Sequence, residues 1–153
     1  MRRQSPTITT SCTPSTRVAV ISTVLPGTIR REILPITGNI IPVIYCPQFA
    51  AMSTVVRDVL YPEFVLLGGD NPYPLSKVEE FFNELLPLES LSRPMKRMAF
   101  ESAELTKCAY NGMVTMKTVF ANTLGDLAQK IPYCNVDDVT DTLKLATNRL
   151  ISS

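Results

Sequence analysis

The amino-acid sequence predicts an α/β protein, in which a partial parallel sheet is followed by an all-helical segment that begins with a long helix. Two observations support this prediction. In the first hundred residues, short apolar runs alternate with a helical pattern, as is typical of parallel sheets with crossover helices. From Glu101 to Lys130 there is no proline, and apolar residues recur every three or four positions. This spacing indicates one continuous helix.

Three apolar runs predict the strands of the sheet. They are "RVAVIST" at 17–23, "IIPVIY" at 40–45 and "EFVLLGG" at 63–69. The runs lack the polar alternation of a half-exposed strand, which is typical of strands that are covered on both faces. Three strands do not complete a doubly wound sheet, so we expect the end of an α/β domain joined to the start of a helical one.

Two helices are predicted before the long helix, one after the first strand and one after the third. Pro26 and Gly27 end the first strand in a turn, and Thr28 is predicted to cap a short helix through "IRREIL". The segment 74–86, "PLSKVEEFFNELL", is amphipathic, begins with a proline and is followed by one. Both features are typical of helix boundaries.

The predicted helix at 101–130 is longer than a small α/β layer needs. At about 1.5 Å rise per residue it would extend about 45 Å, a length that suits a helix joining domains or subunits. Asn135 is then predicted to cap a further helix over "VDDVTDTLKLATN", whose early aspartates suit the positive end of a helix.

Composition excludes several classes of protein. The net charge of the 153 residues is +1, so no basic field favours a nucleic-acid partner. The sequence contains no histidine, which excludes Ser-His and Cys-His nucleophile pairs and His-ligated metal centres, and we expect no metal. No apolar run approaches the length of a membrane span, so a membrane partner is not expected.

The cysteines and the first residues bear on location. None of Cys12, Cys46, Cys108 and Cys134 forms a C-x-x-C pair, so free thiols and a cytoplasmic location are expected. Residues 1–16 are rich in Ser, Thr and Pro, which favours a disordered or loop segment. A transit peptide would also suit this composition, but its amphipathic apolar face is missing.

The stretch "AELTKCAYN" at 103–111 places three polar residues on one face of the long helix. Offsets of three and four residues bring Glu104, Lys107 and Asn111 into one stripe. From spacing alone, the stripe indicates a solvated face with one exposed ion pair of small energetic value.

Three segments resemble a known family. "STVLPGT", "YCPQFAAMSTVVRDVLYPEFVLLGG" and "SAELTKCAYNGMVTMKTVFANTLGDL" occur in the order and spacing of the UDP-glucose/GDP-mannose dehydrogenase family. The resemblance runs from about Arg17 to the C-terminus. It implies that residues 17–100 form the second half of a Rossmann-type NAD-binding domain. Residues 101–153 would begin the central helical domain, and the helix at 101–130 would form a homodimer contact.

The resemblance also implies an activity and a site. Family members oxidise the C6 alcohol of a UDP- or GDP-hexose to a carboxylate with NAD, and hold an aldehyde intermediate on a cysteine. Thr23 matches the threonine near the nicotinamide and the substrate. Lys107 and Asn111 match the lysine and asparagine that stabilise the oxyanion and position water. With Phe49 they would contact the substrate, so the polar stripe would face a ligand.

The sequence departs from the family at several positions. Gln48 stands where members have a carboxylate, and an amide cannot take a proton. Met52 and Ser53 replace a common Glu-Gly. The family's glycine-rich NAD fingerprint and its nucleophilic cysteine have no match among the 153 residues, and Cys108 is expected to pack in the core. We therefore expect a fragment of such an enzyme that is not active alone.

Two alternatives stay open. A β-hydroxyacid or 6-phosphogluconate type dehydrogenase also carries a lysine and an asparagine four residues apart on the helix after its NAD domain, although "PQF" and "STVLPGT" favour the nucleotide-sugar family. The second alternative is a non-catalytic helical pairing module, which the missing fingerprint and nucleophile would allow.

Overall fold

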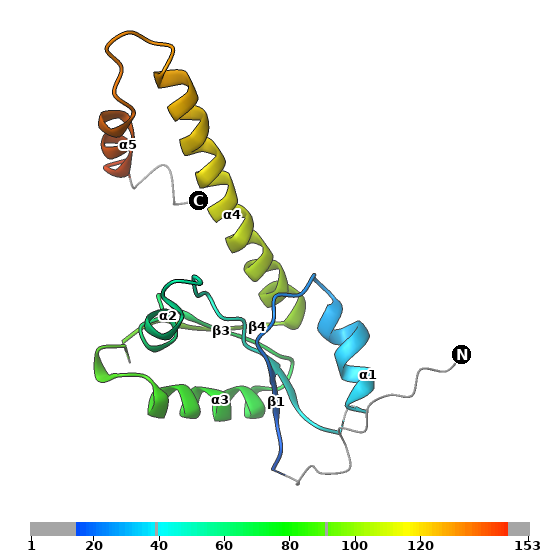
Figure 1. Cartoon of the computed structure of the whole chain (residues 1–153). Coiled ribbons are helices and arrows are strands. Elements are labelled where there is room, and N and C mark those ends of the chain that lie inside the picture. The colour runs from blue at the N-terminus through cyan, green and yellow to red at the C-terminus, as the bar shows by residue number, and fades with distance from the viewer. Residues whose placement is uncertain (1–14, 39, 91, 147–153) are drawn as a thin grey trace. The chain divides into compact units, whose positions relative to one another are not determined.

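The computed structural model describes residues 15–38, 40–90 and 92–146. Most of the predicted loop segment at 1–16 therefore lies outside the described residues. The chain divides into two compact units, Met1–Ala109 and Tyr110–Ser153. The first unit holds a sheet with its helices, and the second is helical where it is described (Figure 1). The predicted α/β class is thereby confirmed.

The sheet of the first unit has four strands in the order β1-β2-β3-β4. β1 pairs with β2 in parallel, as predicted, and β3 pairs in parallel with β4. The join between the two pairs is a single antiparallel pairing of Tyr45 with Gly68. The strands are β1 (Val18–Val20), β2 (Val43–Tyr45), β3 (Val65–Gly68) and β4 (Met95–Met98).

The strand β4 was not predicted. Its sequence, Met-Lys-Arg-Met, has two charged residues at its centre, and both are exposed. The strand lies at the edge of the described sheet, where charged side chains are common because they discourage pairing with other chains. Arg97 forms an ion pair with Glu79 of the helix α3 (Pro72–Leu85).

Most predicted helices of the first unit are present. The predicted helix at 74–86 is confirmed as α3 (Pro72–Leu85), and the Asn71 side chain caps it by accepting from the Tyr73 amide. The segment after β1 is helical as predicted, with the π-helix η2 (Ile29–Ile33) continued by α1 (Leu34–Ile36). Two short helices were not predicted, namely α2 (Val55–Leu60) and the 3₁₀-helix η3 (Leu88–Ser90).

Buried side chains form two clusters, and consecutive residues of β2 and β3 alternate between them. One cluster joins the sheet to α3, and the other joins it to η2 and the first turn of α4 (Phe100–Ala128). The two strands are thus covered on both faces, as their apolar runs predicted. The first cluster is Ile44, Cys46, Val65, Leu67, Leu75, Phe82 and Leu86, and the second is Ile29, Val43, Tyr45, Leu66, Phe100 and Ala103.

Gly68 allows α4 to lie close to the end of β3. A Cβ atom at this position would lie 2.7 Å from the Cβ of Ala103, a distance that real side chains do not show. The glycine is therefore required for the contact that places the first turns of α4 on the sheet.

The long helix and the helix after it are both confirmed. α4 is continuous over 29 residues. α5 (Val136–Lys144) begins after Asn135, whose side chain accepts from the Asp137 amide as predicted, but it ends earlier than expected. Within the second unit, α5 returns beside the last turns of α4 (Figure 1). No described helix is long and apolar enough to span a membrane.

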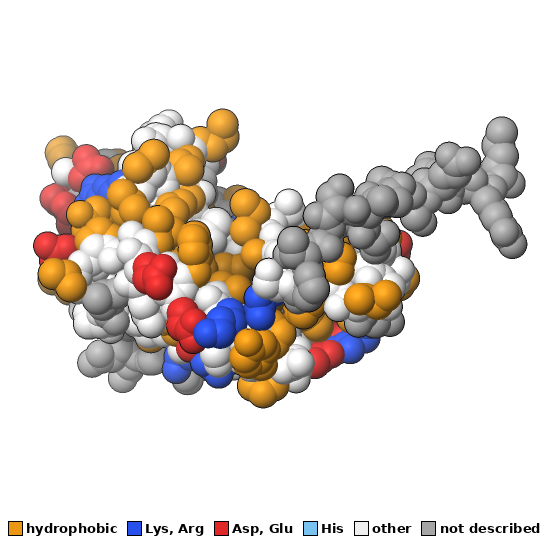
Figure 2. Space-filling model, turned by 90° about the horizontal axis from the view of Figure 1, so that it is seen from below, with side chains coloured by type: hydrophobic (Ala, Val, Ile, Leu, Met, Phe, Trp, Pro, Cys, Tyr) orange, Lys and Arg blue, Asp and Glu red, His pale blue; other side chains and the backbone are white. Residues whose placement is uncertain are grey.

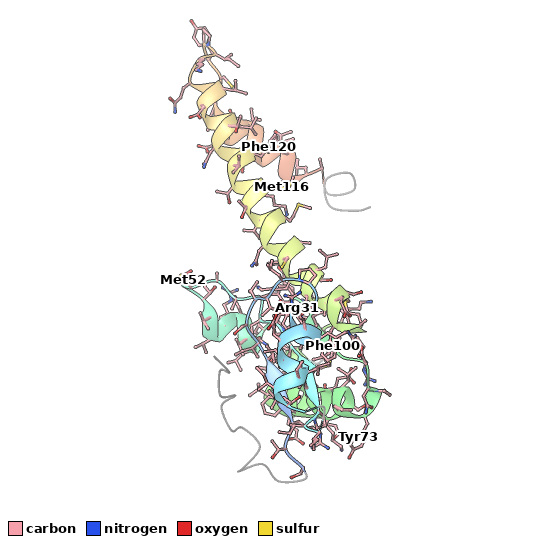
Figure 3. All side chains as sticks on the ribbon, turned by 90° about the vertical axis from the view of Figure 1, so that its right-hand side faces the viewer. Arg31, Met52, Tyr73, Phe100, Met116 and Phe120 are labelled. Atoms are coloured by element: carbon pink, nitrogen blue, oxygen red, sulfur yellow. The ribbon has the colours of Figure 1, made fainter. Side chains whose placement is uncertain are left out.

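Apolar side chains remain exposed in the second unit. Met116 and Phe120 lie on the side of α4 that faces α5 (Figure 3), and both are more than half exposed. They belong to an open apolar groove, which we call the α4–α5 groove. Its lining includes Met113, Met116, Phe120 and Leu124 of α4, with Leu143 and Ala146 from α5 and the residues after it.

Charges of both signs are mixed on the described surface. In the view from below, Lys and Arg side chains lie beside Asp and Glu side chains, among hydrophobic patches (Figure 2). The described part of this face therefore shows no large field of one sign, in keeping with the net charge of +1.

Candidate active site

The first turns of α4 contact the two loops that follow β1 and β2. Glu104 and Cys108 bind the loop after β1, and Lys107 binds the loop after β2. Because β1 and β2 are parallel, both loops leave the same edge of the sheet. Ligands of open α/β sheets bind outside the carboxyl ends of the strands, so this edge is the candidate site.

Lys107 is a buried cation. Only 6% of the residue is exposed, and its Nζ donates to the Gln48 carbonyl oxygen at 2.7 Å. The same Nζ lies 4.6 Å from the centre of the Phe49 ring, within the range of a cation–π interaction. Burial lowers the pKa of Lys107. The ammonium is thus held in a fixed place with little water around it, where its charge acts strongly.

Gln48 contacts Lys107 through its backbone, and Phe49 contacts it through its side chain. Gln48 contributes its backbone carbonyl, whereas its side-chain Nε2 donates at 3.3 Å to the carbonyl oxygen of Cys46. Phe49 contributes its ring, which packs at 4.6 Å against the ring of Phe64. Three of the predicted site residues, Lys107, Gln48 and Phe49, are therefore in direct contact.

Cys46 is unsuited to act as a nucleophile. Its thiol lies in the hydrophobic core, and burial raises the pKa of Cys46 to about 12. Because the thiolate is the reactive form, a thiol with this pKa is inert near neutral pH.

Glu104 has a role that sequence reasoning missed. The residue is completely buried, and its carboxylate accepts from the amides of Gly27 at 2.5 Å and Ile29 at 2.7 Å. The predicted cap by Thr28 is wrong, because that side chain makes no capping hydrogen bond. A carboxylate 75 residues further along the chain takes its place. The solvated face that spacing indicated is also wrong for Glu104 and Lys107, since both are buried.

Thr23 lies in the loop after β1 and is exposed. Its neighbour Val24 accepts a hydrogen bond at 3.3 Å from the thiol of Cys108, which is the neighbour of Lys107. The hydrogen bond between Cys108 and Val24 therefore joins the chain neighbours of Lys107 and Thr23. Cys108 is half-buried and belongs to neither buried cluster, so it does not pack in the core as expected and instead contacts this loop.

Asn111 is the predicted site residue that belongs to the other unit. It follows Lys107 by one turn of α4, is exposed, and belongs to the second unit. The contacts described above join Lys107, Gln48 and Phe49 and reach the neighbour of Thr23, but they do not include the Asn111 side chain. Its predicted role stays a prediction.

Arg30 forms a second link between α4 and the sheet. Its guanidinium donates to Glu101 of α4 at 2.5 Å and to Asp70, after β3, at 2.8 Å. These partners raise the pKa of Arg30, and Arg30 lowers the pKa of Glu101. All three side chains are exposed to a large extent, so their pairing orients the elements more than it stabilises them. Because Arg30 is 71 residues from Glu101 and 40 from Asp70, no sequence pattern predicted these pairs.

No described group of three His, Cys, Asp or Glu side chains could hold a metal ion. The edge of the sheet instead offers an ammonium, a hydroxyl and an aromatic ring, which suit an organic ligand with a polar oxygen.

Curated relatives share this part of the chain. The GDP-mannose 6-dehydrogenase of Pseudomonas aeruginosa is 30% identical over 122 residues, which are 74% of this chain and 27% of the relative. The UDP-glucose 6-dehydrogenase of Rickettsia conorii is 28% identical over 116 residues, 74% of this chain and 26% of the relative. The chain is homologous to these 6-dehydrogenases. It spans about a quarter of the length of either relative. No family model matches the sequence.

Solved structures of GDP-mannose and UDP-glucose dehydrogenases have the same fold. A ternary complex of GDP-mannose dehydrogenase from Pseudomonas aeruginosa superposes with a TM-score of 0.79 and 26% identity, covering 89% of this chain and 31% of that one. A UDP-glucose dehydrogenase from Pyrobaculum islandicum gives a TM-score of 0.73 at 24% identity, covering 84% and 29%. The predicted fold and family resemblance are therefore confirmed.

Proposed function

We propose that this chain is a segment of an NAD-dependent nucleotide-sugar 6-dehydrogenase, which oxidises the C6 alcohol of a UDP- or GDP-hexose to the uronic acid. The observation that carries the proposal is the buried Lys107 ammonium, held between the Gln48 carbonyl and the Phe49 ring beside the carboxyl ends of β1 and β2. The homology to 6-dehydrogenases supports the choice of reaction.

Lys107 stabilises the charge that develops on the substrate. When a hydride leaves C6, the attached oxygen gains alkoxide character, and an ammonium donor lowers the energy of that state. Its existing contacts fix the ammonium before the substrate arrives, so little reorganisation is needed during reaction. Burial strengthens the interaction because fewer water molecules screen it.

Gln48 cannot receive the proton of the alcohol. Its side chain binds back to Cys46, and an amide has no basic form near neutral pH. The proton of the C6 hydroxyl must therefore pass to another acceptor. We assign Gln48 the task of holding Lys107 through its backbone carbonyl. Phe49 and Asn111 are assigned to the substrate, as the family resemblance implies.

The described residues fit one end of NAD. Thr23 is exposed in the loop after β1, where a hydroxyl can contact the nicotinamide. The pyrophosphate normally binds a glycine-rich turn at a helix N-terminus, and the 153 residues contain no G-x-G-x-x-G. NAD supplies the hydride acceptor when it is bound. This chain supplies Thr23 and Lys107 at the reacting end.

The proposal includes location, organisation and partner. Free thiols at Cys46, Cys108 and Cys134 support a cytoplasmic location. We assign residues 17–100 to the NAD-binding domain and 101–153 to the central helical domain. The exposed apolar side chains of α4 support a homodimer, since patches of this kind mark interfaces. The same side chains support the alternative of a non-catalytic helical pairing module.

A chimera tests the proposal. Residues 17–146 replace the corresponding segment of the Pseudomonas aeruginosa relative, and NADH formation is followed with UDP- and GDP-sugars. We expect turnover that depends on Lys107, and no steady NADH production by the 153-residue chain alone. A folded chimera without turnover would favour the pairing module. Turnover with a β-hydroxyacid, but with no nucleotide sugar, would favour the other dehydrogenase class.

A further inference from the structure

Glu104 connects α4 to the turn between β1 and η2. Both oxygens of its carboxylate are used, one by the Gly27 amide and one by the Ile29 amide. These amides lie at the start of η2, where backbone donors have no partner within the helix. Gly27 has a φ of +85°, a conformation that glycine adopts readily and other residues rarely do. One buried side chain thus satisfies a turn of unusual shape.

The same face of α4 binds this turn at three levels. Glu101, Glu104 and Cys108 are spaced by three and four residues, so they lie on one side of the helix. They bind, in order, the Arg30 side chain, the amides of Gly27 and Ile29, and the Val24 carbonyl. Of the three contacts only that of Glu104 is made by a completely buried charge. It is therefore the contact that holds the turn most firmly.

We propose that Glu104 is a positioning residue, which fixes the loop carrying Thr23 against the helix carrying Lys107. This inference rests on the proposed function, because it assigns Thr23 and Lys107 to one ligand. Glu104 itself does not touch the reacting atoms. It lies one turn before Lys107 on α4, and its partners follow Thr23 by four and six residues. Loss of its two bonds frees the loop while Lys107 keeps its own contacts with Gln48 and Phe49.

The Glu104→Gln substitution removes one of the two hydrogen-bond acceptors and keeps the side-chain volume nearly constant. A glutamine has one acceptor oxygen, and its NH₂ group would face a backbone N–H. We expect the amides of Gly27 and Ile29 to exchange with solvent about tenfold faster, which corresponds to one lost hydrogen bond to a charged group. Amides of β3 should keep their exchange rates. Glu101→Gln, which removes a carboxylate that binds only the Arg30 side chain, is the matched control and should leave Gly27 and Ile29 unchanged.

A titration tests whether Glu104 positions Thr23 relative to Lys107. The ¹⁵N-labelled 153-residue chain is titrated with NADH and with UDP-glucose or GDP-mannose at millimolar concentration. In the unsubstituted chain, the signals of Thr23 and Lys107 should shift together with one apparent Kd. In Glu104→Gln, the Lys107 signal should still shift, whereas the Thr23 response should weaken about tenfold or more. Glu104→Asp, which keeps the charge, should restore part of that response. A loss of stability alone would leave both responses of the folded chain intact.

Each other result has a defined meaning. If Gly27 and Ile29 exchange faster in Glu104→Gln but Thr23 and Lys107 still respond together, Glu104 is only a structural cap and the proposal is wrong. Unchanged exchange at both amides would also overturn it. If no nucleotide sugar shifts Lys107 in the unsubstituted chain, the proposed function fails, and the exchange data then describe the turn alone. Should Glu104→Gln not fold, the same two measurements on Glu104→Asp decide, because that variant keeps the buried charge.

Discussion

The two halves of α4 share a helical spacing of apolar residues but differ in how far their side chains are buried. In the first unit, Phe100, Ala103, Glu104 and Lys107 are all buried against the sheet and its loops. In the second unit, Met113, Met116 and Phe120 are all at least half exposed, although they recur at the same helical spacing. Apolar periodicity therefore predicts a helix, but it does not predict what covers it. In the first half, polar residues are buried because backbone groups of distant loops bind them.

Substitution of a lysine in each half should give the largest difference. In the chimera described above, Lys107→Ala should lower kcat by about 10² to 10³, the usual cost of one group that stabilises an oxyanion. Lys117→Ala removes an exposed lysine from the second half of the same helix and should leave kcat unchanged. Steady-state kinetics with circular dichroism as a folding check measure both. Equal activity of the two variants would contradict the proposed catalytic role of Lys107.

A glycine in each unit sharpens the comparison through stability. Gly68→Ala places a Cβ 2.7 Å from the Cβ of Ala103 and should destabilise the first unit by about 1–3 kcal/mol, as overpacking does. Gly112→Ala meets no atom within 4 Å and should stabilise α4 by about 0.5–1 kcal/mol, because alanine is the better helix former. Urea unfolding measures both free energies. A Gly68→Ala variant that is as stable as the unsubstituted chain would show that α4 does not pack on β3 as described.

The α4–α5 groove tests whether the exposed half of α4 is an interface. Phe120→Glu introduces a charge into this groove, and we expect the proposed self-association to weaken at least tenfold. Val114→Glu changes an exposed apolar residue that does not line the groove, and it should have a smaller effect. Sedimentation at micromolar to high micromolar concentration measures the association. A chain that is monomeric throughout this range would contradict the predicted homodimer.

Local patterns predicted the parts of the fold whose cause is local. The predicted cap at Asn135 accepts from the amide of Asp137, two residues further on, so a short stretch of sequence contains both partners. α4 follows from apolar spacing, and the strand β3 follows from a short apolar run. The strand β4 was missed because its centre is charged and its place at the edge of the sheet depends on its neighbours.

The candidate site depends on contacts between distant residues. Lys107 binds a carbonyl 59 residues away, and Glu104 binds amides 75 and 77 residues away. No spacing rule along α4 can distinguish a buried carboxylate from a solvated one, since both fit the same helical stripe. The family resemblance selected Lys107, but only the structure assigned a partner to Glu104.

The smallest expected effect concerns ion pairs, which also differ between the two units. In the first unit, Arg97 of β4 pairs with Glu79 of α3 and so joins two elements, whereas Lys144 and Asp141 pair within α5. The hydrogen bond from Arg97 lowers the pKa of Glu79 below its usual 4.5. A carboxyl group with a lowered folded-state pKa stabilises the fold above its unfolded pKa, and this contribution is lost as the pH falls through the folded pKa.

Between neutral pH and that lower pKa, Glu79→Gln should therefore reduce the loss of stability caused by acid. The reduction should be small because the pair is partly solvated. Asp141→Asn, which removes a pair inside one helix, is the matched control, and urea midpoints measured from pH 7 downward compare the two. An identical pH profile for Glu79→Gln and the unsubstituted chain would show that the pair does not connect β4 to α3 in solution.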